Sequence, residues 1–132
     1  MLSIEVKLSS KIDTIGEFAF EDCTKISSVT IPNGIKKIGK NAFFGCESLE
    51  ELDIPESVEI IEDGAFSACI NLKEVNLSEG LKEINRAFTH NDSLTSIELP
   101  DSLESLGGFE SCFLLTEINI STNVVEFFLK CL

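Results

Sequence analysis

The stretch Ile38–Cys46, with the sequence IGKNAFFGC, occurs three times in similar form within this chain of 132 residues. IGEFAFEDC stands 23 residues before it, and IEDGAFSAC stands 23 residues after it. In each copy an Ala-Phe pair is followed by a Cys three positions beyond the Phe. A fixed period in the low twenties is typical of a solenoid, in which each repeat forms one coil that stacks on its neighbours. The repeat therefore predicts a stack of coils.

Extending the alignment gives six coils, of which the first and the last are incomplete. Each coil opens with an apolar–polar–apolar triplet, an alternation that predicts a β-strand with one buried face. The triplets begin at Val6, Val29, Leu52, Val75, Ile97 and Ile118. Four apolar columns follow: Ile12, Ile35, Val58, Leu81, Leu103, Val124; Ile15, Ile38, Ile61, Ile84, Leu106, Phe127; Phe20, Phe43, Phe66, Phe88, Phe109, Phe128; and Cys23, Cys46, Cys69, Asn91, Cys112, Cys131. With coils about 4.8 Å apart, each column should form a continuous ladder inside the molecule.

The frame L-x-x-V-x-I-P-x-x-V-x-x-I-G-x-x-A-F-x-x-C resembles the BspA-type leucine-rich repeat, and Leu49–Cys69 is close to the ideal form. The resemblance covers residues 1–132 as one domain of about five to six coils. It implies a right-handed leucine-rich-repeat solenoid with a parallel β-sheet on one face and short strands, turns or 3-10 segments on the other. It also implies non-catalytic protein binding, with adhesion at a cell surface among the roles of the family.

Two coils depart from the regular length. The fourth coil is one residue shorter between Ile84 and Ala87, and the fifth is two residues shorter between Leu106 and Phe109. We expect Gly107–Gly108 to form the tight turn that this deletion leaves. The loops opposite the sheet should therefore shorten towards the C-terminus and give a tapered or more curved array.

The cysteines are expected to be part of the core. No C-x-x-C pair occurs, and the cysteine spacing equals the repeat length. Side chains stacked in a ladder point the same way, which disfavours disulfides between neighbours, and a buried Cys packs as a small apolar residue. Asn91 takes the Cys position in the fourth coil, where it either caps a turn through local backbone or faces solvent.

The net charge of −13 and the pI near 4.3 argue against nucleic acid or an anionic membrane as the partner. Strand alternation sends two columns to the outer face of the sheet, and six of their residues are acidic, five of them from the third to the sixth coil. We expect a protein partner, with a basic segment, to bind this face. The candidate residues are Glu51, Asp53, Glu74, Asn76, Glu98, Glu117 and Asn119. The alternative is an acidic surface that only keeps the protein soluble.

The sequence predicts no catalysis and no cofactor. His90 is the only histidine, and no phosphate-binding, dinucleotide-binding, zinc-protease or hydrolase motif occurs. No metal site is expected either, because calcium needs six to eight converging oxygens and the side chains of a flat sheet converge poorly. The alternative function is a structural segment of a longer repeat array, with a spacer or assembly role and no ligand of its own.

The last residues, 124–132, resemble unfinished core, which leaves three interpretations open. The chain is part of a larger protein, it associates end to end with itself through the C-terminal coil, or this coil folds over as its own cap. No apolar run is long enough for membrane insertion, and the N-terminus lacks the pattern of a secretory signal. The compartment stays open, because the family suggests the cell surface or secretion while free cysteines suggest the cell interior.

Overall fold

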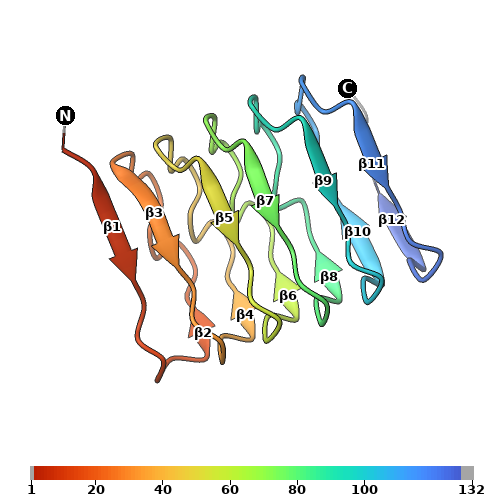
Figure 1. The fold of residues 1–132 in the computed structure, drawn as a ribbon, viewed down its shortest axis with the longest axis horizontal. Coiled ribbons are helices and arrows are strands. Elements are labelled where there is room, and N and C mark those ends of the chain that lie inside the picture. Colours follow the sequence, from red (N-terminus) through yellow and green to blue (C-terminus); the bar gives the residue numbers. More distant parts are fainter. Residues whose placement is uncertain (1, 129–132) are drawn as a thin grey trace.

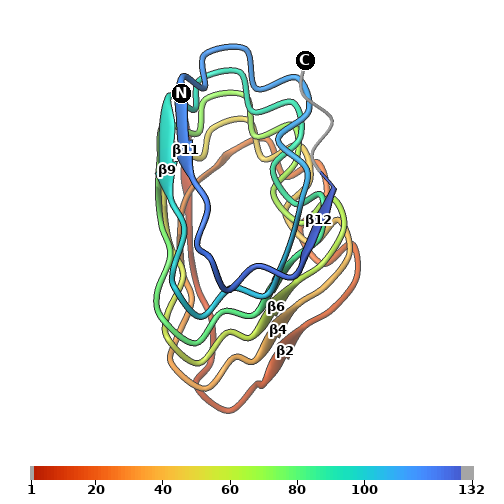
Figure 2. The same ribbon diagram turned by 90° about the vertical axis from the view of Figure 1, so that its right-hand side faces the viewer.

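The computed structural model describes residues 2–128, together with their side chains except that of Phe128, as a stack of coils built from strands and turns (Figure 1). Viewed along the stack, successive coils superimpose as similar rings (Figure 2). The described residues contain no helix. Longer strands line one side of the rings: β1 (Ile4–Lys7), β3 (Ile26–Thr30), β5 (Glu51–Asp53), β7 (Glu74–Asn76), β9 (Ser96–Glu98) and β11 (Glu117–Asn119). Short strands line the other: β2 (Thr14–Ile15), β4 (Lys37–Ile38), β6 (Ile60–Ile61), β8 (Glu83–Ile84), β10 (Ser105–Gly107) and β12 (Glu126–Phe128).

The short strands form one continuous parallel sheet in the order β12-β10-β8-β6-β4-β2. Its register places Ile15 beside Ile38, then Ile61 beside Ile84, and Leu106 beside Phe127. These residues are one of the columns predicted from the repeat. The stacking register is therefore confirmed across all six coils.

The longer strands form three separate parallel pairs, β1–β3, β5–β7 and β9–β11. The predicted sheet is present, but no strand pairing joins β3 to β5 or β7 to β9. The strands are also displaced by one residue from the predicted triplets, since β5 begins at Glu51 rather than at Leu52. A three-residue strand forms few ladder bonds, so we infer that the packed side chains beneath it largely determine its position.

The phenylalanine column forms the predicted ladder of stacked rings. The centroids of Phe43 and Phe66 are 5.2 Å apart, and their planes differ by 4°. Phe20 stacks on Phe43 at 5.0 Å, and Phe66 stacks on Phe88 at 5.8 Å. Phe88 and Phe109 continue the stack at 5.7 Å, whereas the side chain of Phe128 lies outside the described residues.

Hydrogen bonds between coils hold the turns on this side of the stack. The backbone N–H of Phe43 donates to the carbonyl of Ala65 at 2.8 Å, and that of Phe66 donates to the carbonyl of Ala87 at 2.9 Å. The main chains approach closely here, which explains the small residue before each Phe. In the fifth coil this residue is Gly108, with φ of 101°, and a Cβ on it would lie 2.7 Å from the Cα of Arg86. The predicted tight turn at Gly107–Gly108 is not found as such, because Gly107 is the last residue of β10 and Gly108 follows it with a positive φ.

Two residues of the four predicted columns are exposed, one in the first coil and one in the last, and Ile120 of the sixth triplet is 39% exposed as well. Ile12 is 38% exposed and Phe127 is 51% exposed. The other members of their columns in the middle coils are fully buried. Each exposed residue belongs to a terminal coil, which has a neighbour on one side only among the described residues. The prediction that these side chains are part of the core was wrong for this reason.

Three thiols of the cysteine column, those of Cys46, Cys69 and Cys112, are buried as predicted, while Cys23 is partly exposed. Cys23, Cys46, Cys69 and Cys112 are free thiols, and Cys131 lies outside the described residues. The Sγ of Cys69 donates to the carbonyl of Phe43 at 3.3 Å, and the Sγ of Cys112 donates to that of Phe88 at 2.9 Å. The thiols of Cys46, Cys69 and Cys112 thus each donate to the carbonyl of the Phe in the preceding coil, which explains why Phe and Cys recur together.

Asn91 is fully buried, so the alternative that places it in solvent was wrong. Its Oδ1 accepts a hydrogen bond from the backbone N–H of Cys69 at 3.3 Å. The partner therefore belongs to the preceding coil and not to a local turn. The Nδ2 of Asn91 is buried and has no hydrogen-bond partner among residues 2–128, which makes this position a local weakness of the core.

The buried thiols should make the protein less stable at alkaline pH. Burial, with a smaller contribution from Cys23, raises the pKa of Cys46 to about 12, and burial also raises the pKa of Cys69 and of Cys112. The unfolded chain loses these protons first as the pH rises, so the free energy of unfolding should fall from about pH 9 upward. Urea titrations followed by circular dichroism at several pH values measure this slope. The Cys46→Ala variant should show a shallower slope, and an identical slope would contradict the assignment.

Candidate protein-binding face

The candidate site lies on the outer side of strands β5, β7, β9 and β11. In each strand the central residue points inward, and Leu52, Val75 and Ile97 are at most 7% exposed. The flanking residues point outward because successive side chains of a strand alternate between its faces. All seven predicted residues are exposed: Glu51, Asp53, Glu74, Asn76, Glu98, Glu117 and Asn119. We call these seven residues the acidic face.

The first half of the acidic face lies on the pair β5–β7. Glu51 stands directly opposite Glu74, and Asp53 stands opposite Asn76. The Nδ2 of Asn76 donates to Oδ1 of Asp53 at 2.7 Å, which orients this carboxylate. Two like charges at about 5 Å repel each other by roughly 1 kcal/mol in water. The pairing of Glu51 with Glu74 therefore costs stability and would be relieved by a cation.

The second half of the acidic face lies on the pair β9–β11. Glu98 stands opposite Asn119, and Glu117 stands opposite Ser96. The Nδ2 of Asn119 lies 3.5 Å from Oε1 of Glu117 on the same strand. Here each acidic residue is opposed by a neutral polar one, so this half is less strained than the first.

The carboxylates of the acidic face form no ion pairs with the described residues. The ion pairs present there join Lys37 to Glu62, Lys73 to Glu50, and Arg86 to Glu110. None of them includes a residue of the acidic face. Its five carboxylates are therefore exposed and lack a neutralising partner within this part of the chain.

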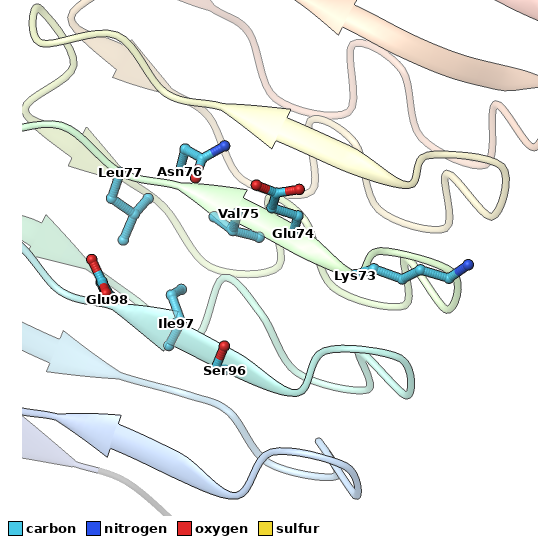
Figure 3. A pocket seen from close by; sticks show the side chains of 8 residues that line it. All are labelled: Lys73, Glu74, Val75, Asn76, Leu77, Ser96, Ile97 and Glu98. Carbon is cyan, nitrogen blue, oxygen red and sulfur yellow. The ribbon is translucent and has the colours of Figure 1, made fainter.

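A groove of about 320 Å³ separates the two halves, where β7 and β9 are not hydrogen bonded. Figure 3 shows the side chains that line it on these two neighbouring strands. The lining residues are Lys73, Glu74, Val75, Asn76, Leu77, Ser96, Ile97 and Glu98. The sequence carries no signal for this groove, because the triplets of the fourth and fifth coils follow the same pattern as the others.

No metal site is found in the described part of the chain. His90 is exposed in a turn, while Cys69 and Cys112 in the adjacent coils are buried thiols. Among residues 2–128, no group of three or more His, Cys, Asp or Glu side chains could hold a metal ion. No helix in that range is long and apolar enough to span a membrane.

The repeat pattern and the coil geometry agree with a known family. The model of the BspA type leucine rich repeat region matches residues 3–108 and 85–132, in six copies. The chain belongs to the BspA-type leucine-rich repeat family. No curated protein sequence matches this BspA-type chain.

Solved structures with the same fold are bacterial leucine-rich repeat proteins. The leucine rich repeat protein of T. pallidum has 25% identity and a TM-score of 0.79, and the match covers 96% of this BspA-type chain and 73% of that protein. A leucine-rich repeat protein of Bacteroides ovatus has 31% identity and a TM-score of 0.72, and the match covers 95% of this chain and 39% of that protein. A leucine rich cell surface protein of Faecalibacterium prausnitzii has 31% identity and a TM-score of 0.64, and the match covers 89% of this chain and 38% of that protein. The chain thus spans well under half of the latter two proteins.

Proposed function

We propose that this chain is a non-catalytic protein-binding module whose acidic face binds a basic segment of a partner protein. The main supporting observation is that five carboxylates lie exposed on one face without ion-pair partners among the described residues. Complementary charge increases the rate of association and disfavours partners of the wrong sign. The face is also built on regular strands, and repeat proteins commonly bind partners along such extended surfaces.

An adhesive role at a cell surface is part of this proposal. It is supported by the similarity to the cell surface protein of Faecalibacterium prausnitzii, of which this chain spans 38%. The thiols of Cys46, Cys69 and Cys112 are fully buried. Burial keeps these three thiols neutral and inaccessible to oxidants, so they are compatible with an oxidising compartment, whereas Cys23 is partly exposed.

The acidic face can be tested with a decalysine peptide as the basic probe. In the triple variant Glu51→Ser, Asp53→Ser and Glu74→Ser, binding should weaken about tenfold, since each exposed ion pair contributes roughly 0.2–1 kcal/mol. The salt dependence of binding should also become flatter. Isothermal titration at several salt concentrations measures both effects.

A matched control removes the same charge from elsewhere on the surface. Glu56, Glu59 and Glu104 are exposed, lie outside the longer strands and form no side-chain hydrogen bond or ion pair with the described residues. Their replacement by Ser should change the affinity much less than the triple variant does. Equal losses in both variants would show that only net charge matters and would overturn the proposed face.

A second candidate function is assembly by end-to-end stacking, which would make the chain a segment of a longer array. Of the ten large apolar side chains exposed in the described residues, seven lie in the terminal coils. These seven are Leu2, Ile4, Ile12, Phe18, Ile120, Val125 and Phe127, whereas Phe113 and Leu114 lie in the fifth coil and Ile70 in a middle coil. The strands of these coils also pair on one side only. Apolar side chains and open strand edges together favour contact with another coil.

Analytical ultracentrifugation over a range of concentrations tests this second candidate. The protein should associate as the concentration rises, and Val125→Glu should abolish the association because this side chain is 87% exposed on the last coil. Ile70→Glu is the control, since Ile70 is exposed on a middle coil. A monomer at every concentration would contradict self-assembly.

A further inference from the structure

The groove between β7 and β9 has polar main-chain groups along its β7 side. The N–H of Glu74 donates to Glu50 at 3.3 Å, and the carbonyl of Asn76 accepts from Ile54 at 2.8 Å, so both residues bond towards β5. Main-chain groups of alternate residues in a strand point to opposite sides. Those of Val75 and Leu77 therefore point towards β9, where no backbone hydrogen bond receives them.

The β9 side of the groove has the complementary arrangement. The carbonyl of Thr95 accepts from the N–H of Thr116 at 3.1 Å and thus points towards β11. By the same alternation, the main-chain groups of Ser96 and Glu98 point towards β7. The groove thus contains carbonyl acceptors from both strands, and the side chains of Glu74 and Glu98 line it as well.

The charge in the groove is negative. Lys73 is its only basic lining residue, and its ammonium extends away from Ser96 and Glu98 (Figure 3). Lys73 also lies 3.9 Å from Glu50, an acidic residue outside the groove. The carboxylates of Glu74 and Glu98 are therefore left to attract a cation.

We propose that this groove binds an arginine side chain of the partner's basic segment; the inference rests on the proposed function and specifies its central contact. An additional strand does not fit, because Cα atoms of β7 and β9 approach within 8 Å and an inserted strand needs about 9.6 Å, twice the ladder spacing. A side chain does fit. Arginine presents five donors in a rigid plane and can bond carbonyls and carboxylates together, whereas lysine has three donors on one nitrogen.

The test compares two peptides of equal charge, decaarginine and decalysine. The wild-type chain should bind decaarginine at least about tenfold more tightly at the same salt concentration, which corresponds to roughly one additional charged hydrogen bond. Filling the groove with Ser96→Phe should remove this preference. Ser28→Phe is the matched control, because Ser28 occupies the same outward column on β3, away from the groove, and should keep the preference.

A second pair of variants tests the charges without adding bulk. Glu74→Gln with Glu98→Gln removes both carboxylates of the groove, and Glu51→Gln with Glu117→Gln removes two from the acidic face outside it. The first pair should abolish the preference for decaarginine. The second pair should lower the affinity for both peptides equally and should keep the preference. Circular dichroism checks that every variant is folded.

The outcomes separate this inference from the proposed function. If both peptides bind the wild type with equal affinity, or if the groove variants keep the arginine preference, the groove proposal is overturned and the acidic face remains supported. If neither peptide shows salt-dependent binding, both proposals are overturned. If the preference is present in the wild type and lost only in the groove variants, the arginine contact is supported.

Discussion

The substitution Phe66→Ala should lower the free energy of unfolding by about 3–5 kcal/mol, the usual cost of truncating a buried aromatic residue. Phe66 is fully buried and stacks on Phe43 at 5.2 Å and on Phe88 at 5.8 Å. Truncation therefore leaves a cavity in the middle of the ladder and removes the contact of two neighbouring rings. A domain with a stability of about 5–15 kcal/mol loses a large part of it in this way.

Urea unfolding followed by far-ultraviolet circular dichroism measures this loss, since the chain contains no Trp or Tyr for fluorescence. Phe113→Ala is the matched control, because Phe113 is 71% exposed. This variant should stay within about 0.5 kcal/mol of the wild type. Similar unfolding midpoints for the two variants would contradict a core built on stacked rings.

The substitution Gly108→Ala should cost roughly 3 kcal/mol, although it adds a single methyl group. Gly108 has φ of 101°, which is unfavourable for any residue with a Cβ. The new Cβ would also lie 2.7 Å from the Cα of Arg86, and a backbone atom cannot move aside as a flexible side chain can. The two coils would have to separate at the position where their turns are closest.

Gly16→Ala provides the control for this prediction. Gly16 directly follows Ile15 in the first coil, and Gly108 stands two residues after Leu106 of the same column. A Cβ built on Gly16 meets no atom within 4 Å. Its replacement should be neutral or slightly stabilising, because Ala restricts the unfolded chain more than Gly does. Thermal unfolding of both variants gives the comparison. A Gly108→Ala protein as stable as Gly16→Ala would mean that the coils are not in close contact there.

The columns of the core were predictable because each is specified several times over. Phe43 has an equivalent in every coil, so one assignment fixes the others and the register of the stack. The exposure of Glu51 and Glu98 was equally predictable, since strand alternation alone sends them outward. The repeat thus contained most of the information about which side chains are buried and which form the acidic face.

Two features depended on contacts that the pattern does not encode. The buried position of Asn91 depends on the backbone N–H of Cys69, a group of another coil that donates a hydrogen bond to the side-chain oxygen of Asn91. The groove depends on the separation of the main chains of β7 and β9. Their triplets, beginning at Val75 and Ile97, have the same polarity as that at Leu52, whose strand is paired. Pairing was therefore expected and is not found.

The bonding of each coil to its immediate neighbours has a consequence for how such molecules can vary in size. A turn that donates from Phe43 to Ala65 would find the same acceptor on any coil of this design. Length can therefore change in whole-coil steps, by duplication or loss, without rearranging what is already present. A longer member of the family would present a longer track of unchanged width, with room for a longer stretch of its ligand.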